Sequence, residues 1–410
     1  MEGRIQHLAA IIDPALPPYT RRAFTEPFLR GRRWLQAEFE GAGLSTVTDA
    51  GGNLMGKLAG SEPGALPIAM GSHSDTVVGG GRYDGIAGVV AALEVAQSLA
   101  EDGMRPRHPL LVVDFLAEEA SDYGPSCVGS RAIAGTLSPA MLEAANAQGE
   151  SLAEALRRMG GDPDRAAAGP IHGREPFAAF VEMHIEQGPV LESEGLPIGV
   201  VTGVVGIRRL ALRVQGQADH AGTTPMHMRR DALVGAAELI KLVHQRAREA
   251  HTHTGLVATV GQMTHSPNQS NVVPESALLT IDARCASMQG VTDFTDAIVR
   301  EGGSLLADHG LALEHTVVLD AEPCSFAPPV RQAIGNAARK RGHAFREMQS
   351  GAGHDAMHIA QVCPTGMLFV PSRGGRSHAS QEHTTTQQLC VGAEVLLEAV
   401  LELDATLPLR

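Results

Sequence analysis

In the first half of the chain, short apolar runs alternate with longer helical patterns, and this alternation restricts the fold more than any other feature. Residues 66–71 and 110–116 are predicted strands, because both are short and rich in aliphatic side chains. The stretch 85–99 between them is rich in Ala, Val and Leu and is predicted to be a helix. A strand, a crossover helix and a second strand together indicate an α/β fold.

Side chains that suit a metal follow both predicted strands. His73, Asp75 and Asp84 lie in the segment GSHSDTVVGGGRYDG, and Glu118 and Glu119 follow the second strand. Functional groups of open α/β sheets gather at the carboxyl ends of strands, so we expect both segments at one edge. Imidazole and carboxylate suit a divalent cation, and an aspartate on a glycine-rich turn can offer one oxygen to each of two ions. The pattern indicates half of a two-metal hydrolase site, whose ions lie ~3.5–4 Å apart.

Each of these residues also has a purely structural interpretation. A single His-x-Asp is common as a buried pair, so the argument depends on the combination. Asp75 suits a role in orienting His73. The glycines 79–81 could cradle a phosphate, but no Lys-Ser or Lys-Thr follows them. Glu118 and Glu119 would point apart on extended backbone, so we expect one to bind metal and the other to face water; a solvated helix turn is the alternative.

Three histidines remain open as further ligands. The predicted strand 177–185 carries Glu182 and His184, which share one face because they are two positions apart. A core histidine with a satisfied hydrogen bond is an equal alternative for His184. Near the C-terminus, the segment GGRSHASQEH offers His378 and His383, and their spacing alone does not choose between them.

The pattern of the chain changes after about residue 206. A strand, a helix, two strands and a helix are predicted at 208–215, 231–250, 256–263, 276–284 and 293–309. This order indicates an inserted α+β domain with a half-exposed antiparallel sheet. After about residue 322 the earlier pattern returns, with a strand at 366–370 and a helix at 389–403. We therefore expect a discontinuous domain of residues 1–206 and 322–410 and an inserted domain of residues 207–321.

Composition narrows the class of protein. With 410 residues, 43% hydrophobic and 19% charged, the chain is long enough for two globular domains. The net charge of −13 without a long basic run argues against nucleic acid or an anionic membrane as partner. No apolar run suits a signal peptide or a membrane span, so we expect a cytoplasmic protein. The five scattered cysteines indicate neither a disulfide framework nor a cysteine metal site.

Taken together, the motifs resemble the M20 peptidase superfamily, and specifically its hydantoinase/carbamoylase branch. The matching motifs, which run from about residue 20 to the C-terminus, are GSHSDT with GGGRYDG, AEEAS, EMHIEQGPVLE, DHAGTTPM, NVVP followed by Asp-Ala-Arg, SGAGHDA and SHASQEHT. This branch contains N-carbamoyl-L-amino acid hydrolases, allantoate amidohydrolases and β-ureidopropionases. The resemblance implies an α/β, mixed-sheet dinuclear metallohydrolase domain with an inserted α+β lid and dimerisation domain, and hence a homodimer.

The resemblance also implies a role for each matched residue. The metal ligands would be His73 and His184 on one ion, Glu119 and His378 on the other, and Asp84 between them. The catalytic residues would be Glu118 as the general base, His220 at the oxyanion, and Asp75, which would orient His73. The substrate contacts would be Gln187, Asn271, Arg284, Gly353 and His354. Two divalent ions are expected, zinc first, with manganese, cobalt or nickel as alternatives.

The expected reaction follows from the same resemblance. The chain would hydrolyse the carbamoyl C–N bond of an N-carbamoyl-L-amino acid, releasing the amino acid, ammonia and carbon dioxide. Allantoate or a β-ureido acid is the alternative substrate for the same residues. A catalytically silent homologue that only binds such a ligand is the alternative from another class.

Overall fold

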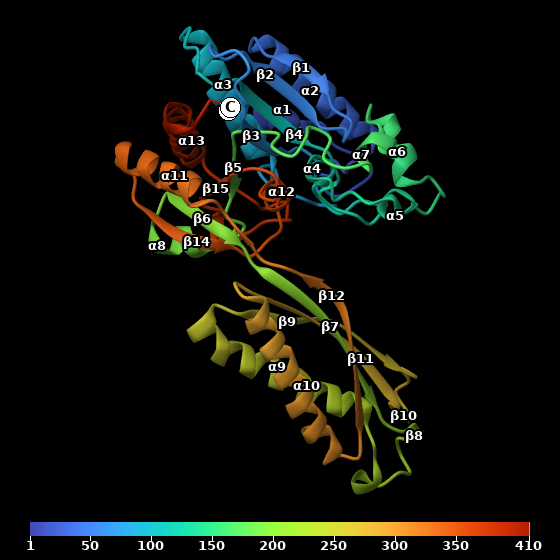
Figure 1. The fold of residues 1–410 in the computed structure, drawn as a ribbon. Helices are drawn as coiled ribbons and strands as arrows, with labels where there is room; N and C mark the ends of the chain where they lie inside the picture. The colour runs from blue at the N-terminus through green and yellow to red at the C-terminus, as the bar shows by residue number, and fades with distance from the viewer. Residues whose placement is uncertain (410) are drawn as a thin grey trace. The chain divides into compact units, whose positions relative to one another are not determined.

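The computed structural model describes residues 1–409, and contacts divide the chain into two units (Figure 1). The first unit comprises Met1–Gly203 and the chain from Ser325 onward, and the second comprises Val204–Cys324. The second unit extends three residues beyond the expected 207–321 at each end. Its assignment as a lid or dimerisation domain stays a prediction.

The first unit is built on a nine-stranded mixed sheet of order β1-β2-β4-β3-β5-β15-β6-β13, with β14 paired to β6. The strands are β1 (Ser45–Thr48), β2 (Leu54–Leu58), β3 (Ile68–His73), β4 (Leu110–Phe115), β5 (Ala179–Ile185), β6 (Ile198–Val204), β13 (Cys324–Ser325), β14 (Phe345–Ser350) and β15 (Thr365–Val370). The central strands β4, β3, β5 and β15 are parallel to one another. Their carboxyl ends therefore meet at one edge of the sheet.

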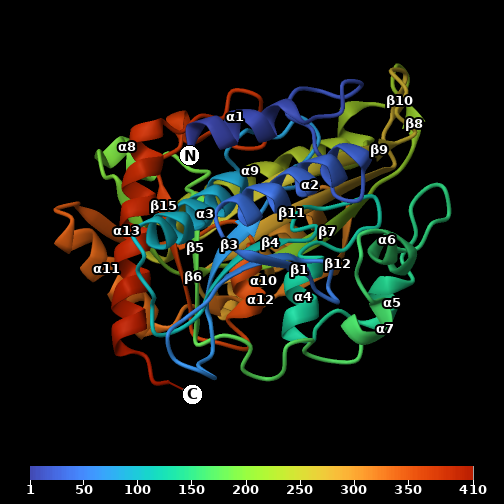
Figure 2. The ribbon, with the colours of Figure 1, turned by 90° about the horizontal axis from the view of Figure 1, so that it is seen from above.

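Helices pack on both faces of this sheet. The core of one face includes α1 (Glu2–Ala10), α2 (Glu26–Gly41), α3 (Ile86–Glu101), α11 (Pro328–Lys340) and α13 (Thr386–Thr406). Here α11 and α13 lie side by side (Figure 2). The helices α4 (Val128–Ala134) and α12 (Asp355–Ile359) contact each other and the central strands. The short helices are α5 (Pro139–Leu142), α6 (Leu152–Arg158), α7 (Pro163–Ala166) and α8 (Val190–Glu194).

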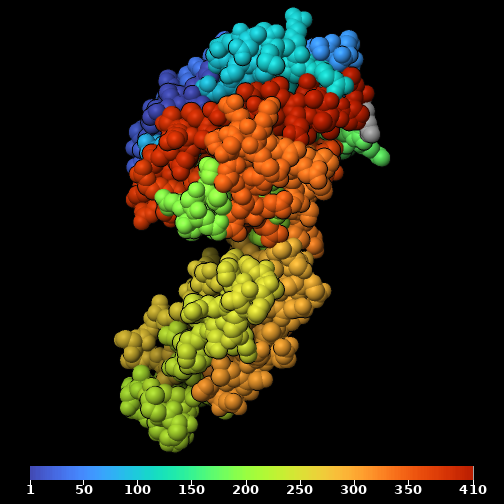
Figure 3. Space-filling model, turned by 90° about the vertical axis from the view of Figure 1, so that its left-hand side faces the viewer, coloured from blue at the N-terminus to red at the C-terminus, as the bar shows by residue number. Residues whose placement is uncertain are grey.

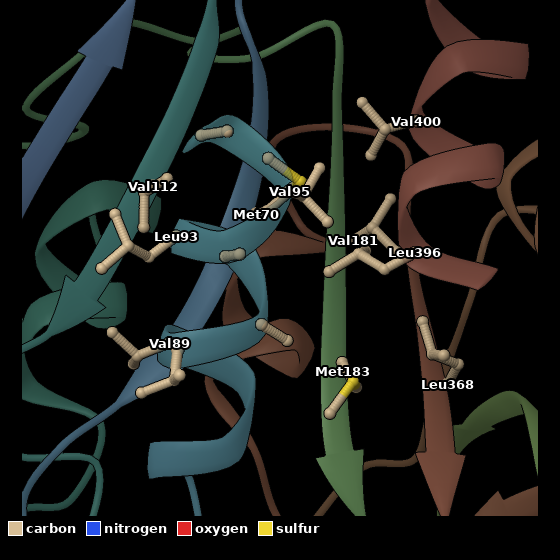
Figure 4. Close-up of a cluster of buried hydrophobic side chains, with 14 of the residues drawn as sticks. Met70, Val89, Leu93, Val95, Val112, Val181, Met183, Leu368, Leu396 and Val400 are labelled. Carbon is tan, nitrogen blue, oxygen red and sulfur yellow. The ribbon is translucent and has the colours of Figure 1, made fainter. Parts of the chain in front are cut away.

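Alternate residues of the parallel strands form the core against α3 and α13. Met70, Val112 and Val181 of three neighbouring strands belong to one buried cluster with Leu93 of α3 and Leu396 of α13 (Figure 4). Each such side chain contributes about 1.5–3 kcal/mol when it is fully buried. This packing fixes the level at which each strand ends, and so fixes where the polar residues after each strand lie.

The second unit is a four-stranded antiparallel sheet of order β12-β7-β11-β9. Its strands are β7 (Gly206–Gln215), β9 (Val257–Ser266), β11 (Ser276–Cys285) and β12 (Ala312–Ala321). The helices α9 (Ala232–Thr254) and α10 (Met288–Ala307) contact each other and cover one face (Figure 1). Yellow and orange atoms of this unit lie next to each other on the surface shown in Figure 3. Buried and half-buried residues alternate along β11, as expected for a sheet covered on one face. A two-stranded ribbon of β8 (Asp219–His220) and β10 (Val272–Val273) continues beyond the Ser276 end of the sheet.

The fold class expected from the sequence is confirmed: an α/β unit with a mixed sheet and a separate antiparallel α+β unit. Every strand and helix predicted above is present, with ends shifted by at most five residues. The sequence did not indicate β12, because its side chains are mostly exposed and show no apolar alternation. No helix within residues 1–409 is long and apolar enough to cross a membrane.

Candidate active site

The candidate ligands lie at the carboxyl ends of the parallel strands. His73 is the last residue of β3, Glu118 and Glu119 follow β4, and His184 is the second-last residue of β5. The segment after β15 carries His378. This is the edge where open α/β sheets hold their ligands.

One cluster joins His73, Asp84 and His184, whose ligand atoms all lie within 4.8 Å of one another. Asp84 Oδ1 lies 3.1 Å from His184 Nε2 and 3.6 Å from His73 Nε2. The Nδ1 atoms face backbone carbonyls instead. His73 Nδ1 lies 3.1 Å from the Asp75 carbonyl oxygen, and His184 Nδ1 lies 2.8 Å from the Ile185 carbonyl oxygen. A hydrogen on each Nδ1 can donate to these carbonyls, so the Nε2 atoms of both rings are the ones that face Asp84.

A second cluster joins Asp84, Glu119 and His378. His378 Nε2 lies 3.1 Å from Asp84 Oδ2 and 3.1 Å from Glu119 Oε1. The two oxygens of Asp84 therefore face different clusters, which is the arrangement that a bridging carboxylate requires. His383 belongs to neither cluster, and its Nδ1 lies 3.3 Å from the Tyr83 hydroxyl.

The residues present fit a pair of divalent cations. Burial raises the pKa of Glu118 well above its ordinary value, and burial also raises that of Asp75 to about 6. Burial disfavours a charged His184, yet Asp84 raises its pKa to about 9. Hydrogen bonds to Asp84 and to Glu119 raise the pKa of His378 to about 10. Burying several carboxylates close together costs free energy unless a positive charge compensates them. A set of imidazole and carboxylate donors suits zinc and its neighbours.

Asp75 contacts both His73 and the turn that follows β4. Its carboxylate accepts hydrogen bonds from the backbone N–H groups of Glu118 at 3.3 Å and Glu119 at 3.1 Å. Its Oδ1 lies 3.6 Å from His73 Nδ1, farther than its own backbone carbonyl. The backbone of Asp75 thus orients His73, while its side chain holds the turn that presents both glutamates.

Two neighbours of the site were not found from the sequence. A Cβ atom on Gly85 would lie 2.4 Å from ring atoms of His73, and the Gly85 N–H lies 3.1 Å from His184 Nε2. Only glycine therefore fits between the two imidazoles. Cys127 is buried with its Sγ 3.7 Å from Glu118 Oε1, and Glu118 Oε2 lies 3.7 Å from His73 Nε2. The only local signal in the sequence for either neighbour was the position of Gly85 directly before the apolar helix α3.

Two of the expected substrate contacts lie beside the clusters. Gln187 donates from Nε2 to Asp84 Oδ2 at 2.8 Å. His354 is buried, with its ring centroid 4.5 Å from that of His184. Gly353 is exposed in the loop that precedes α12.

The other three expected residues belong to the second unit and lie at two ends of its sheet. His220 and Asn271 are exposed on the β8–β10 ribbon, where the Ala221 N–H donates to the Asn271 carbonyl at 3.0 Å. Arg284 lies near the other end of β11 and donates from Nε to Asp282 Oδ1 at 2.7 Å. The eight steps along the strand from Ser276 to Arg284 span about 26 Å of extended backbone.

Comparison with known proteins identifies relatives over nearly the whole chain. Residues 62–402 match the model of peptidase family M20/M25/M40. The N-carbamoyl-L-amino-acid amidohydrolase of Paenarthrobacter aurescens is 40% identical over 95% of this chain and 94% of its own. The allantoate amidohydrolase of Bacillus subtilis is 33% identical over 94% of this chain and 92% of its own.

A solved structure agrees with these relatives. The crystal structure of a hydantoinase/carbamoylase family amidase from Burkholderia multivorans has a TM-score of 0.91 at 36% identity, and the match covers 99% of this chain and 98% of that one. The family match, the curated relatives and the shared fold lead to one conclusion. The chain belongs to the hydantoinase/carbamoylase branch of peptidase family M20 and is an amidohydrolase.

Proposed function

We propose that this chain hydrolyses the carbamoyl C–N bond of an N-carbamoyl-L-amino acid, producing the amino acid, ammonia and carbon dioxide. The observation that carries the proposal is the pair of clusters that share Asp84 beside the buried Glu118. The substrate class rests on the 40% identity to an N-carbamoyl-L-amino-acid amidohydrolase.

The metal centre would be held by residues from both clusters. The ligands would be His73 and His184 for one cation, Glu119 and His378 for the other, and Asp84 for both. Divalent cations bound there supply Lewis acidity and lower the pKa of a water molecule. Zinc is the first expectation, with manganese, cobalt or nickel as alternatives.

Glu118 would move the proton in this reaction. Burial raises the pKa of Glu118 well above its ordinary value, which is the direction in which enzymes tune a carboxyl group that exchanges protons near neutral pH. Glu118 takes a proton from the water that attacks the carbamoyl carbon. It then gives this proton to the amino-acid nitrogen as the C–N bond breaks, and the remaining carbamate decomposes to ammonia and carbon dioxide.

Residues of the second unit would recognise the substrate. Arg284 offers a planar charged fork for the substrate carboxylate, and Asp282 orients it. Asn271 would also bind the carboxylate, and His220 would stabilise the oxyanion, a contribution of about 3–4 kcal/mol per donor. Since about 26 Å of strand separates Arg284 from the ribbon end, one copy of this unit cannot bring all three to one small substrate. We therefore propose a homodimer in which each substrate meets Arg284 of one copy and His220 and Asn271 of the other.

The test is ammonia release by metal-loaded protein from N-carbamoyl-L-amino acids, N-carbamoyl-β-alanine and allantoate, with a chelator-treated control. Chelator-sensitive turnover of the carbamoyl amino acids supports the proposal. Preferred turnover of allantoate would favour the second candidate, which rests on the 33% identity to an allantoate amidohydrolase. No turnover by protein that holds two ions would indicate a silent binding homologue.

Glu118→Gln is the matched variant for the chemical step. The amide keeps the size of the side chain but cannot accept the proton, so we expect a loss of about 10²–10⁴-fold in kcat with metal content unchanged. Unchanged kcat would remove Glu118 as the base.

A further inference from the structure

Glu382 is a fully buried carboxylate that connects two distant segments of the first unit. Its Oε1 accepts hydrogen bonds from the backbone N–H groups of Tyr83 at 2.7 Å and Asp84 at 3.1 Å. Its Oε2 accepts from the Ser377 hydroxyl at 2.8 Å. Tyr83 and Asp84 form the turn before α3, whereas Ser377 directly precedes His378. The same carboxylate therefore contacts the backbone of the shared ligand and the loop that carries the ligand of the second cluster.

Gly81 leaves room for this carboxylate because it has no side chain. A Cβ atom on Gly81 would lie 1.8 Å from Glu382 Oε1 and 2.2 Å from Oε2, and its three nearest atoms all belong to Glu382. The φ angle of Gly81 lies outside the left-handed region, so backbone conformation does not demand glycine there. Glycine is required at this position because Glu382 fills the space that a side chain would take.

The two segments also meet through other side chains. The Ser377 hydroxyl lies 2.8 Å from Asp84 Oδ2, the oxygen that faces His378. The Tyr83 and His383 rings pack edge to face, with centroids 5.6 Å apart. His378 itself has a φ of 52°, a conformation that costs about 1–3 kcal/mol for such a residue and requires support from its surroundings.

We propose that Glu382 is a positioning residue of the metal centre, which fixes the Asp84 backbone and the Ser377–His378 loop relative to each other. With Glu382 in place, the two oxygens of Asp84 keep their two directions, one toward each cluster. This role rests on the proposed metal ligands, but it does not depend on which amide is the substrate.

The first experiment measures metal binding by the metal-free full-length chain, using Zn²⁺ titration against a chromophoric chelator. Glu382→Ala is expected to weaken at least one of the two ions by about 10–100-fold, the usual effect of losing a group that orients ligands. Asp404→Ala is the matched control, because buried Asp404 also accepts two successive backbone N–H groups, from Arg107 at 2.9 Å and His108 at 2.7 Å. The control should lose thermal stability and keep both ions.

Glu382→Gln is the conservative variant in case the alanine variant does not fold. The amide oxygen can still accept from the two backbone N–H groups, so we expect the fold to persist. The visible absorption of the Co²⁺-loaded protein should change, because the Ser377 hydroxyl beside His378 would meet an amide NH₂ group in place of the carboxyl oxygen that it now contacts at 2.8 Å. A Co²⁺ spectrum and Zn²⁺ affinity identical to those of the wild type would overturn the role of Glu382.

A double-mutant cycle tests the contact itself. Gly81→Ala alone should weaken metal binding by displacing the Glu382 carboxylate. In the Glu382→Ala background, the same substitution should add nothing, since the atoms it meets are gone. Additive losses would refute the contact. A wild-type chain that fails to bind two ions would overturn the proposed function together with this role, whereas normal wild-type binding and unaltered Glu382→Ala binding would overturn this role alone.

Discussion

Replacing Gly85 by alanine should disturb the metal centre through a single methyl group. The new Cβ would lie 2.4 Å from ring atoms of His73, so the imidazole must retreat by about 1 Å to reach an ordinary contact of 3.4 Å. Gly85 also has φ 65° and ψ −46°, outside the regions open to residues with a side chain. The backbone strain adds about 1–3 kcal/mol of destabilisation.

The expected effect on metal binding follows from the size of this displacement. Bonds from zinc to histidine nitrogen are about 2.0–2.1 Å long, and sites tolerate deviations of about 0.2 Å. A shift of about 1 Å in His73 exceeds this tolerance. We expect the ion held by His73 and His184 to bind at least about 10–100-fold more weakly, which equals about 1.4–2.8 kcal/mol. Chelator competition with Zn²⁺ measures both ions in one titration.

Gly103→Ala provides a matched control at the other end of α3. Gly103 has a similar φ of 67°, and a Cβ there would meet nothing within 4 Å. The control should therefore lose stability from its backbone but bind both ions as the wild type does. Wild-type metal affinity in Gly85→Ala would refute the argument that this glycine makes room for the His73 ring, and equal losses in both variants would attribute the effect to strain.

Four further predictions concern other parts of the molecule. Asp75→Asn turns an NH₂ group toward one of the Glu118 and Glu119 N–H donors, and should cost about 1–3 kcal/mol in urea unfolding; an unchanged midpoint contradicts this. Burial raises the pKa of Asp282, but hydrogen bonds from Arg284 and Arg209 lower it below its ordinary value. The stabilisation by ionised Asp282 is therefore present above about pH 4 and is lost as the pH falls further, so the deficit of Asp282→Asn, about 0.5–1 kcal/mol at pH 7, should shrink on acidification below that pH; a deficit that grows on acidification would contradict this. Arg284→Lys should raise KM at least about tenfold for substrates bearing a carboxylate with metal content intact, because the ammonium lacks the planar fork; an equal rise for neutral amides argues against carboxylate binding. Adding Zn²⁺ at about 100 times its Kd to chelator-treated protein should add about 2.7 kcal/mol to the free energy of unfolding for each ion bound; a zinc-independent thermal midpoint speaks against tight binding.

Local patterns in the sequence were sufficient for the central parallel strands β3, β4, β5 and β15 and for three of the four strands of the second unit, but not for β1, β2, β6, β13 and β14. Hydrophobic periodicity separates strands from helices over windows of a few residues, and it located the strands that end near His73 and Glu118. The combination of imidazole and carboxylate side chains at several strand ends indicated metal chemistry, since both groups are common ligands of divalent cations. Strand β12 was missed because an exposed edge strand has no apolar alternation.

Tertiary structure decided how those residues meet. The contacts of His378 with Asp84 and Glu119, the hydrogen bonds from the two glutamate N–H groups to the Asp75 carboxylate, and the contact between Gly81 and Glu382 all join segments far apart in the chain. None of these contacts leaves a periodic signal in the sequence, because each depends on which strand ends the packed core brings together. The sequence by itself therefore determined which chemical groups are present and at which strand ends they lie. Only the folded sheet decided which oxygen of Asp84 faces which imidazole, because that depends on the relative levels at which the parallel strands end.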